Sequence, residues 1–130
     1  MIVHAEDALQ RAVVSTLRLS PDLKMIAIPN GGKRGKVEAA RMHGLGVMAG
    51  VSDLMILWPV GGIAFIELKR PGLVTGKKRP LKSLRPEQLA FYGWCSLNGF
   101  SATVCDSVEM VEDYLRSCGA PVRTRTGRAA

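Results

Sequence analysis

The first part of the chain has the apolar spacing of a helix. Over residues 4–19 the apolar side chains of Leu9, Val13 and Leu17 recur at every fourth position, which places them on one helix face. Pro21 interrupts the pattern, because proline lacks an N–H donor and restricts the residue before it. We therefore predict a helix over residues 4–19.

The middle of the chain contains a hairpin signal and a helix-start signal. Two apolar runs, 53–58 and 63–69, are separated by a proline, a valine and two glycines, which predicts a β-hairpin. Pro86 predicts the first position of a helix, where a missing N–H costs nothing. Gly99 predicts its end.

The last helix is expected to begin at a capping-box pattern that runs from Asp106 to Glu109. The expected elements are helix 4–19, strand 23–28, helix 36–43, strands 53–58 and 63–69, helix 86–97, strand 100–105 and helix 106–119. This order, α-β-α-β-β-α-β-α, predicts an α/β fold with one mixed β-sheet flanked by helices.

The composition is that of one folded domain with a basic tail. With 130 residues, of which 47% are hydrophobic and 22% charged, the chain can bury one core and is short for two domains. We expect residues 1–119 to form that domain. Residues 120–130 carry three arginines and no expected core position, so we expect a disordered basic tail.

Several protein classes are excluded. No apolar run approaches the roughly 18 residues of a membrane-spanning helix, so no membrane partner is expected. The N-terminus carries charges where a signal peptide would be apolar, which favours an intracellular protein. Three cysteines, Cys95, Cys105 and Cys118, show no CxxC spacing. Neither a disulfide framework nor a structural zinc site is expected.

The charge balance favours a polyanionic partner. Lys and Arg outnumber Asp and Glu by 18 to 11, for a net charge of +7, and residues 69–85 contain only basic charges. A second basic loop, over residues 30–36, lacks the P-loop pattern, so contact with a phosphate backbone suits it better. The alternative is that both basic stretches are solvated surface loops that bind no nucleic acid. The candidate nucleic-acid contacts are Asn30, Lys33, Arg34, Lys36, Arg70, Lys77, Lys78, Arg79, Lys82 and Arg85.

One acidic residue stands out within the apolar run 63–69. An unpaired charge at Glu67 would cost roughly several kcal/mol if buried, and Lys69, two positions on, points to the same strand face. A three-residue loop over 60–62 would place Asp53 opposite Lys69 and on that face. A two-residue loop would place Asp53 on the other face.

Two carboxylates and a lysine on one face would form a hydrolytic site. Carboxylate oxygens suit Mg²⁺ or Mn²⁺. Such an ion polarises a phosphodiester and lowers the pKa of bound water, which a lysine can orient or deprotonate. A plain ion pair between Glu67 and Lys69, with Asp53 as a turn residue, is the alternative, and the pattern alone does not choose between them.

Five motifs in order resemble the VRR-NUC branch of the PD-(D/E)XK nuclease superfamily, over nearly the whole chain. They are Glu6-x-x-x-Gln10, Asn30-Gly31-Gly32, Gly50-Val51-Ser52-Asp53-Leu54, Ile66-Glu67-Leu68-Lys69-Arg70 and Pro86-Glu87-Gln88. Each motif alone is weak evidence for the family, but all five motifs in the order of the family are specific. Ser52 stands where the family has a proline and Arg85 where it has a serine, and neither position supplies a catalytic group.

The resemblance implies a metal centre and a lysine beside it. Asp53 and Glu67 would be ligands of Mg²⁺ or Mn²⁺, together with the backbone carbonyl of Leu68. Lys69 would activate or position the attacking water.

The resemblance also implies three further roles. Gln88 would orient the lysine or the scissile phosphate. Glu6 would reach the metal directly or through water. Gln10 lies one turn further along the same helix face and would support Glu6.

Stand-alone members of the family are small proteins of bacteria and phages. The resemblance therefore implies a cytoplasmic, metal-dependent, structure-specific DNA endonuclease, similar to Holliday-junction resolvases. It would act as a homodimer on branched DNA and leave 5′-phosphate ends. Two alternatives stay open: a nuclease for flap, nicked or linear DNA, and a catalytically inactive nucleic-acid-binding module.

Overall fold

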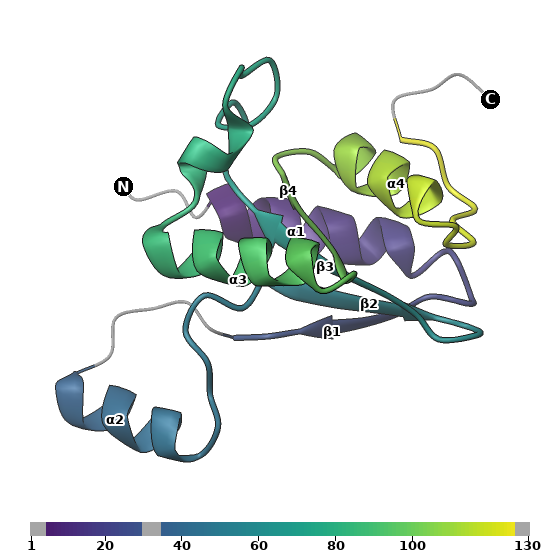
Figure 1. Ribbon diagram of the computed structural model, residues 1–130. Helices are drawn as coiled ribbons and strands as arrows, with labels where there is room; N and C mark the ends of the chain where they lie inside the picture. Colours follow the sequence, from purple (N-terminus) through teal and green to yellow (C-terminus); the bar gives the residue numbers. More distant parts are fainter. Residues whose placement is uncertain (1–4, 30–34, 127–130) are drawn as a thin grey trace.

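The computed structural model describes residues 5–29 and 35–126. Within them, four strands form one mixed sheet in the order β1-β2-β3-β4, with helices around it (Figure 1). The elements are α1 (Ala5–Leu17), β1 (Lys24–Ala27), α2 (Lys36–Gly44), β2 (Leu54–Trp58), β3 (Gly62–Leu68), the 3-10 turn η1 (Pro80–Ser83), α3 (Pro86–Leu97), β4 (Ser101–Cys105) and α4 (Val108–Ser117). β2 is antiparallel to both β1 and β3, and β4 is parallel to β3. The predicted fold class is confirmed.

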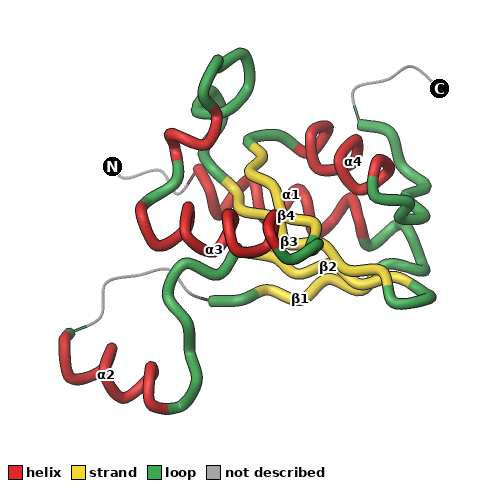
Figure 2. Tube along the Cα trace, in the orientation of Figure 1, coloured by secondary structure: helices red, strands yellow, loops and turns green. Residues whose placement is uncertain are grey.

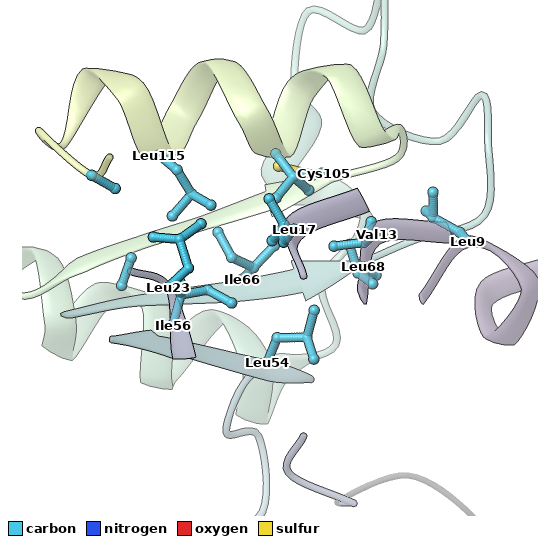
Figure 3. Packing of buried hydrophobic residues seen from close by; sticks show 13 residues of the cluster. Leu9, Val13, Leu17, Leu23, Leu54, Ile56, Ile66, Leu68, Cys105 and Leu115 are labelled. Carbon is cyan, nitrogen blue, oxygen red and sulfur yellow. The ribbon is translucent and has the colours of Figure 1, made fainter. Parts of the chain in front are cut away.

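One face of the sheet carries the hydrophobic core, beneath α1 and α4. Alternate strand residues point to opposite faces, and Leu54, Ile56 and Ile66 all point to this one. They are fully buried and belong to one cluster with Leu17 of α1 and Leu115 of α4 (Figure 3). The predicted apolar face of the first helix is therefore part of the core.

The opposite face of the sheet is covered by α3. Phe65 alternates with the core residues of β3 and meets Phe91 of α3 edge to face, with ring centroids 5.2 Å apart. A residue two positions along a strand shares its face. Glu67 therefore lies on the α3 side of the sheet.

The β2–β3 hairpin determines which side chains meet at its open end. Leu54 pairs with Ile66, and the connecting loop comprises residues 59–61. The loop has the odd length that a shared face requires, but it begins one residue earlier than predicted. Continuing the register by one residue places Asp53 opposite Glu67 instead of opposite the lysine.

The start of α4 differs from the prediction. Ser107 is the N-cap, and its Oγ accepts a hydrogen bond from the Met110 N–H at 3.1 Å. The expected capping box from Asp106 to Glu109 is therefore wrong. Asp106 is buried, and its carboxylate accepts hydrogen bonds from a different loop.

Part of the expected disordered tail packs against the domain. Val122 contacts the core cluster. The buried carboxylate of Glu112 accepts hydrogen bonds from Thr124 Oγ1 at 2.5 Å and from the Thr126 N–H at 2.8 Å. These contacts contradict the expectation of disorder as far as Thr126. Residues 127–130 lie outside the described residues.

Helix α2 stands apart from the sheet (Figures 1 and 2). None of its residues is buried, so the helix contributes no side chain to the hydrophobic core. Over residues 5–29 and 35–126, no helix is long and apolar enough to cross a membrane.

Candidate active site

Three predicted site residues come together where β2 begins and β3 ends. Asp53 directly precedes β2, Glu67 is the penultimate residue of β3, and Lys69 follows that strand. Asp53 Oδ2 accepts a hydrogen bond from the Leu68 N–H at 2.7 Å. Glu67 and Lys69 are 6% and 8% exposed. The end of the hairpin therefore holds two carboxyl groups and a lysine in one largely buried place.

The side-chain amide of Gln88 connects Lys69 to Glu67. Gln88 lies in the first turn of α3 and is buried. Its Oε1 accepts a hydrogen bond from Lys69 Nζ at 3.0 Å, and its Nε2 donates to Glu67 Oε2 at 3.2 Å. Oε1 also accepts from the Arg85 N–H at 2.9 Å, which fixes the amide orientation. No ion pair joins Glu67 directly to Lys69 in the described part of the chain.

Glu67 holds its proton far more tightly than an ordinary glutamate. Burial first, then the charge of Asp53 and a hydrogen bond between the two carboxyl groups, raise its pKa from 4.5 to about 8, although the charge of Lys69 lowers it. Perturbation by burial and a like charge is typical of functional carboxyl pairs.

A close backbone contact holds the segment before Asp53 against α3. Gly50 has a φ of +90°, and a Cβ there would lie 2.2 Å from the backbone oxygen of Glu87. Only glycine accommodates this conformation and this approach. The contact fixes the Gly50–Asp53 segment beside the helix turn that carries Gln88. The sequence motif contained Gly50, but the pattern gave no role for it.

Two predicted residues lie on α1 at the edge of this group. Glu6 is exposed in the first turn of α1, and its charge contributes to the raised pKa of Glu67. Gln10 is half-buried one turn further on. The structure thus places Glu6 within electrostatic reach of the carboxyl pair.

The predicted nucleic-acid contacts that the structure describes are all exposed: Lys36, Arg70, Lys77, Lys78, Arg79, Lys82 and Arg85. Lys36 begins α2, and the others lie in the segment 70–85, which projects beyond the end of β3 (Figure 1). Arg85 forms an ion pair with Glu87 at 3.2 Å. Asn30, Lys33 and Arg34 lie outside the described residues.

The donor set suits a hard divalent cation, although it is small. Asp53 and Glu67 supply carboxylate oxygens, and a cation between them would offset the repulsion that raises the pKa of Glu67. Over residues 5–29 and 35–126, no group of three or more His, Cys, Asp or Glu side chains is arranged to hold a metal. A magnesium site here would therefore include backbone oxygen and water, which Mg²⁺ ordinarily retains.

Comparisons with known proteins show the family and the fold of the chain. The model of the VRR-NUC domain family matches residues 5–109. Two solved structures, described as a VRR_NUC domain and a VRR_NUC domain protein, share the fold with TM-scores of 0.57 and 0.59, at 19% and 20% identity. The alignments cover 88% and 89% of this chain and 97% and 92% of those chains. No curated protein matches the chain.

The family match includes every residue of the candidate site, from Glu6 to Gln88. The arrangement of that site, with an aspartate before β2 and Glu67-Leu68-Lys69 at the end of β3, lies inside the matched region. The chain therefore belongs to the VRR-NUC domain family, a nuclease branch of the PD-(D/E)XK superfamily.

Proposed function

We propose that the protein is a divalent-metal-dependent endonuclease that hydrolyses phosphodiester bonds in branched DNA. The observation that carries the proposal is the group of buried Glu67, Lys69 and Gln88 beside half-buried Asp53, in which one amide connects the lysine to a glutamate of raised pKa. A carboxyl pair beside an oriented lysine provides metal ligands and a water-directing cation in one place.

Asp53, Glu67 and the backbone carbonyl of Leu68 would hold Mg²⁺ or Mn²⁺, with Glu6 binding directly or through water. When bound, the ion would supply Lewis-acid polarisation of the scissile phosphate and lower the pKa of a water molecule. Placement of Glu6 at the edge of the pair, with its charge already acting on Glu67, supports its assignment as an outer ligand.

Lys69 would position or activate the attacking water. An ammonium group has three donor hydrogens, and Gln88 Oε1 accepts one of them. The others can be directed to a water and a phosphate oxygen. The Gln88 amide is already engaged by Lys69, Glu67 and the Arg85 N–H. This supports orientation of the lysine over direct contact of Gln88 with the phosphate.

The basic segment 70–85 would contact the DNA backbone next to the cleaved bond. Its exposed lysines and arginines suit phosphate contacts, which give affinity without sequence preference. A homodimer with two-fold symmetry would present two sites to the two strands that a Holliday-junction resolvase cuts. The expected products carry 5′-phosphate ends.

The test is cleavage of labelled four-way junction, flap, nicked and linear DNA in Mg²⁺, Mn²⁺ or EDTA. Asp53→Asn keeps an oxygen that can accept from the Leu68 N–H but removes a charged ligand. The matched control is Asp22→Asn, because Asp22 is exposed and pairs with Arg123 away from the site. Paired symmetric cuts in the junction, absent in Asp53→Asn, are expected.

The other outcomes separate the alternatives. Cuts confined to flap, nicked or linear DNA would support the proposed hydrolysis but show that branched DNA is not the substrate. Tight junction binding without any cut by the wild-type protein would contradict the nuclease proposal and favour a catalytically inactive binding module.

A further inference from the structure

A buried carboxylate outside the catalytic group holds the basic segment. Asp106 follows β4 and is 2% exposed. Its Oδ2 accepts hydrogen bonds from three backbone N–H groups, those of Gly72 at 2.9 Å, Val74 at 3.0 Å and Thr75 at 2.8 Å. Its Oδ1 accepts a further hydrogen bond from the Thr75 hydroxyl. One side chain thus binds a whole turn of the loop.

These contacts favour the ionised form of Asp106. Burial alone would raise the pKa of this carboxyl. The hydrogen bonds from Thr75, Val74 and Gly72 outweigh that effect and hold the pKa below its ordinary value. A charged acceptor makes stronger hydrogen bonds than a neutral one, so the charge itself contributes to holding the turn.

The held turn lies between the catalytic lysine and the exposed cations. The segment leaves β3 at Lys69 and reaches α3 at Arg85. Gln88 joins the two ends of the segment, because its Oε1 accepts hydrogen bonds from Lys69 Nζ and from the Arg85 N–H. Asp106 holds the segment at Gly72–Thr75, and only Gly76 separates this turn from Lys77. Figure 2 shows the segment as a long excursion with few other elements beside it.

We propose that Asp106 is a positioning residue for DNA binding, which holds the turn Gly72–Thr75 so that Lys77, Lys78 and Arg79 face the phosphate backbone beside the active site. This inference rests on the proposed nuclease function and adds to it a residue that touches neither the DNA nor the metal ligands. Its physical basis is entropic: cations on a held loop lose less conformational freedom on binding than cations on a free one.

A purely structural role is the alternative, and the chain contains a control for it. Glu112 is also a buried carboxylate, 1% exposed, that accepts from a threonine hydroxyl and a backbone N–H. Its partners Thr124 and Thr126 lie in the C-terminal segment, which contains none of the loop cations. Asp106→Asn and Glu112→Gln each remove one buried charge of this kind. Only the first loosens the basic loop.

The experiment compares wild-type protein, Asp106→Asn and Glu112→Gln in two measurements. The first is the rate of tryptic cleavage after Lys77 and Lys78, without DNA, because trypsin does not cut the Arg79–Pro80 bond. We expect that rate to rise about tenfold in Asp106→Asn, because proteolysis follows the population of the open loop, and to stay near the wild-type value in Glu112→Gln. Thr75→Val, which removes only the hydroxyl donor, should give a smaller rise.

The second measurement is binding of a four-way junction at several salt concentrations, in EDTA. Asp106→Asn should weaken binding about tenfold and flatten the salt dependence, because fewer phosphates are neutralised. In Mg²⁺ its KM should rise more than its kcat falls. Equal loop cleavage and equal affinity in Asp106→Asn and Glu112→Gln would overturn the inference while leaving the nuclease proposal intact. A wild-type protein that binds no DNA would overturn both.

Discussion

The Nζ atom of Lys69 lies 3.0 Å from Oε1 of Gln88, which is 19 positions away in the chain. The lysine directly follows strand β3, and the glutamine lies in the first turn of α3. The orientation of the lysine therefore depends on the packing of α3 across the sheet, as well as on its own strand.

Loss of this acceptor should slow cleavage without removing a metal ligand. Gln88→Met should reduce the single-turnover rate about 10- to 100-fold, the usual effect of removing an outer-shell partner. Gln88→Glu keeps an acceptor for Lys69 but places another carboxylate against Glu67, so its cleavage should require higher pH. A Gln88→Met protein that cuts at the wild-type rate would contradict the role of the amide.

The raised pKa of Glu67 predicts a pH dependence of stability in EDTA. Between pH 4.5 and about 8 the folded protein holds a proton that the unfolded chain has released. The stabilising contribution is therefore full below the unfolded pKa and is lost as pH rises through about 8. Thermal unfolding in EDTA should show this decline, and Glu67→Gln should flatten it.

Bound metal should offset the loss of stability that rising pH causes through Glu67. Mg²⁺ or Mn²⁺ binds the ionised carboxylate, so the increase in Tm on adding metal should be larger at pH 8.5 than at pH 6. Removal of the metal with EDTA should abolish the difference. A metal-induced shift that is equal at both pH values, or that persists in Glu67→Gln, would argue against metal binding at this carboxyl.

The approach of Gly50 to α3 predicts an unusually costly alanine substitution. Gly50→Ala combines a left-handed backbone with a Cβ 2.2 Å from the Glu87 oxygen. The matched control is Gly46→Ala, where φ is +96° and nothing lies within 4 Å of the added Cβ. Gly46→Ala should cost about 1–2 kcal/mol of unfolding free energy. Gly50→Ala should cost about 1–3 kcal/mol more, through the clash. Urea unfolding of both variants checks this, and equal costs would exclude the close approach.

Deletion of the C-terminal segment should destabilise the domain. A chain that ends at Ala120 loses the apolar contact of Val122 and leaves the buried Glu112 without Thr124 and Thr126. The expected loss is about 2–4 kcal/mol of unfolding free energy. A chain that ends at Thr126 keeps each of these contacts and is the control. Equal stability of the two shortened chains would show that the segment does not contribute.

The fold class was predictable because most of the helices and strands carry a local signal. The every-fourth spacing of Leu9, Val13 and Leu17 marks the core face of α1, and Pro86 marks the first residue of α3. The meeting of Asp53 with Glu67 required more, because a one-residue change in a hairpin loop reverses the face. From the sequence, an odd length for the β2–β3 loop followed only from the assumption that Asp53 and Glu67 share a site. The structure gives the strand register directly.

The buried carboxylates show why the rest was not predictable. Asp106 and Ser107 both match helix-capping residue types, and the choice between them depends on a turn more than 30 positions earlier in the chain. Glu112 is a charged residue, a type that is mostly exposed, yet the C-terminal segment covers it. Long-range hydrogen bonds of this kind leave no periodic trace in the sequence.

The most direct test of the central claim is the single-turnover rate of cleavage of one labelled four-way junction in Mg²⁺, for wild-type protein and for Lys69→Met. The matched control is Lys24→Met, because Lys24 is an exposed residue of β1. We predict that Lys69→Met lowers the rate by about 10²- to 10⁴-fold. Junction affinity should fall far less, because the exposed cations of segment 70–85 would supply most of the phosphate contacts. Cleavage by Lys69→Met at the wild-type rate, or a wild-type protein that makes no Mg²⁺-dependent cut, would contradict the account.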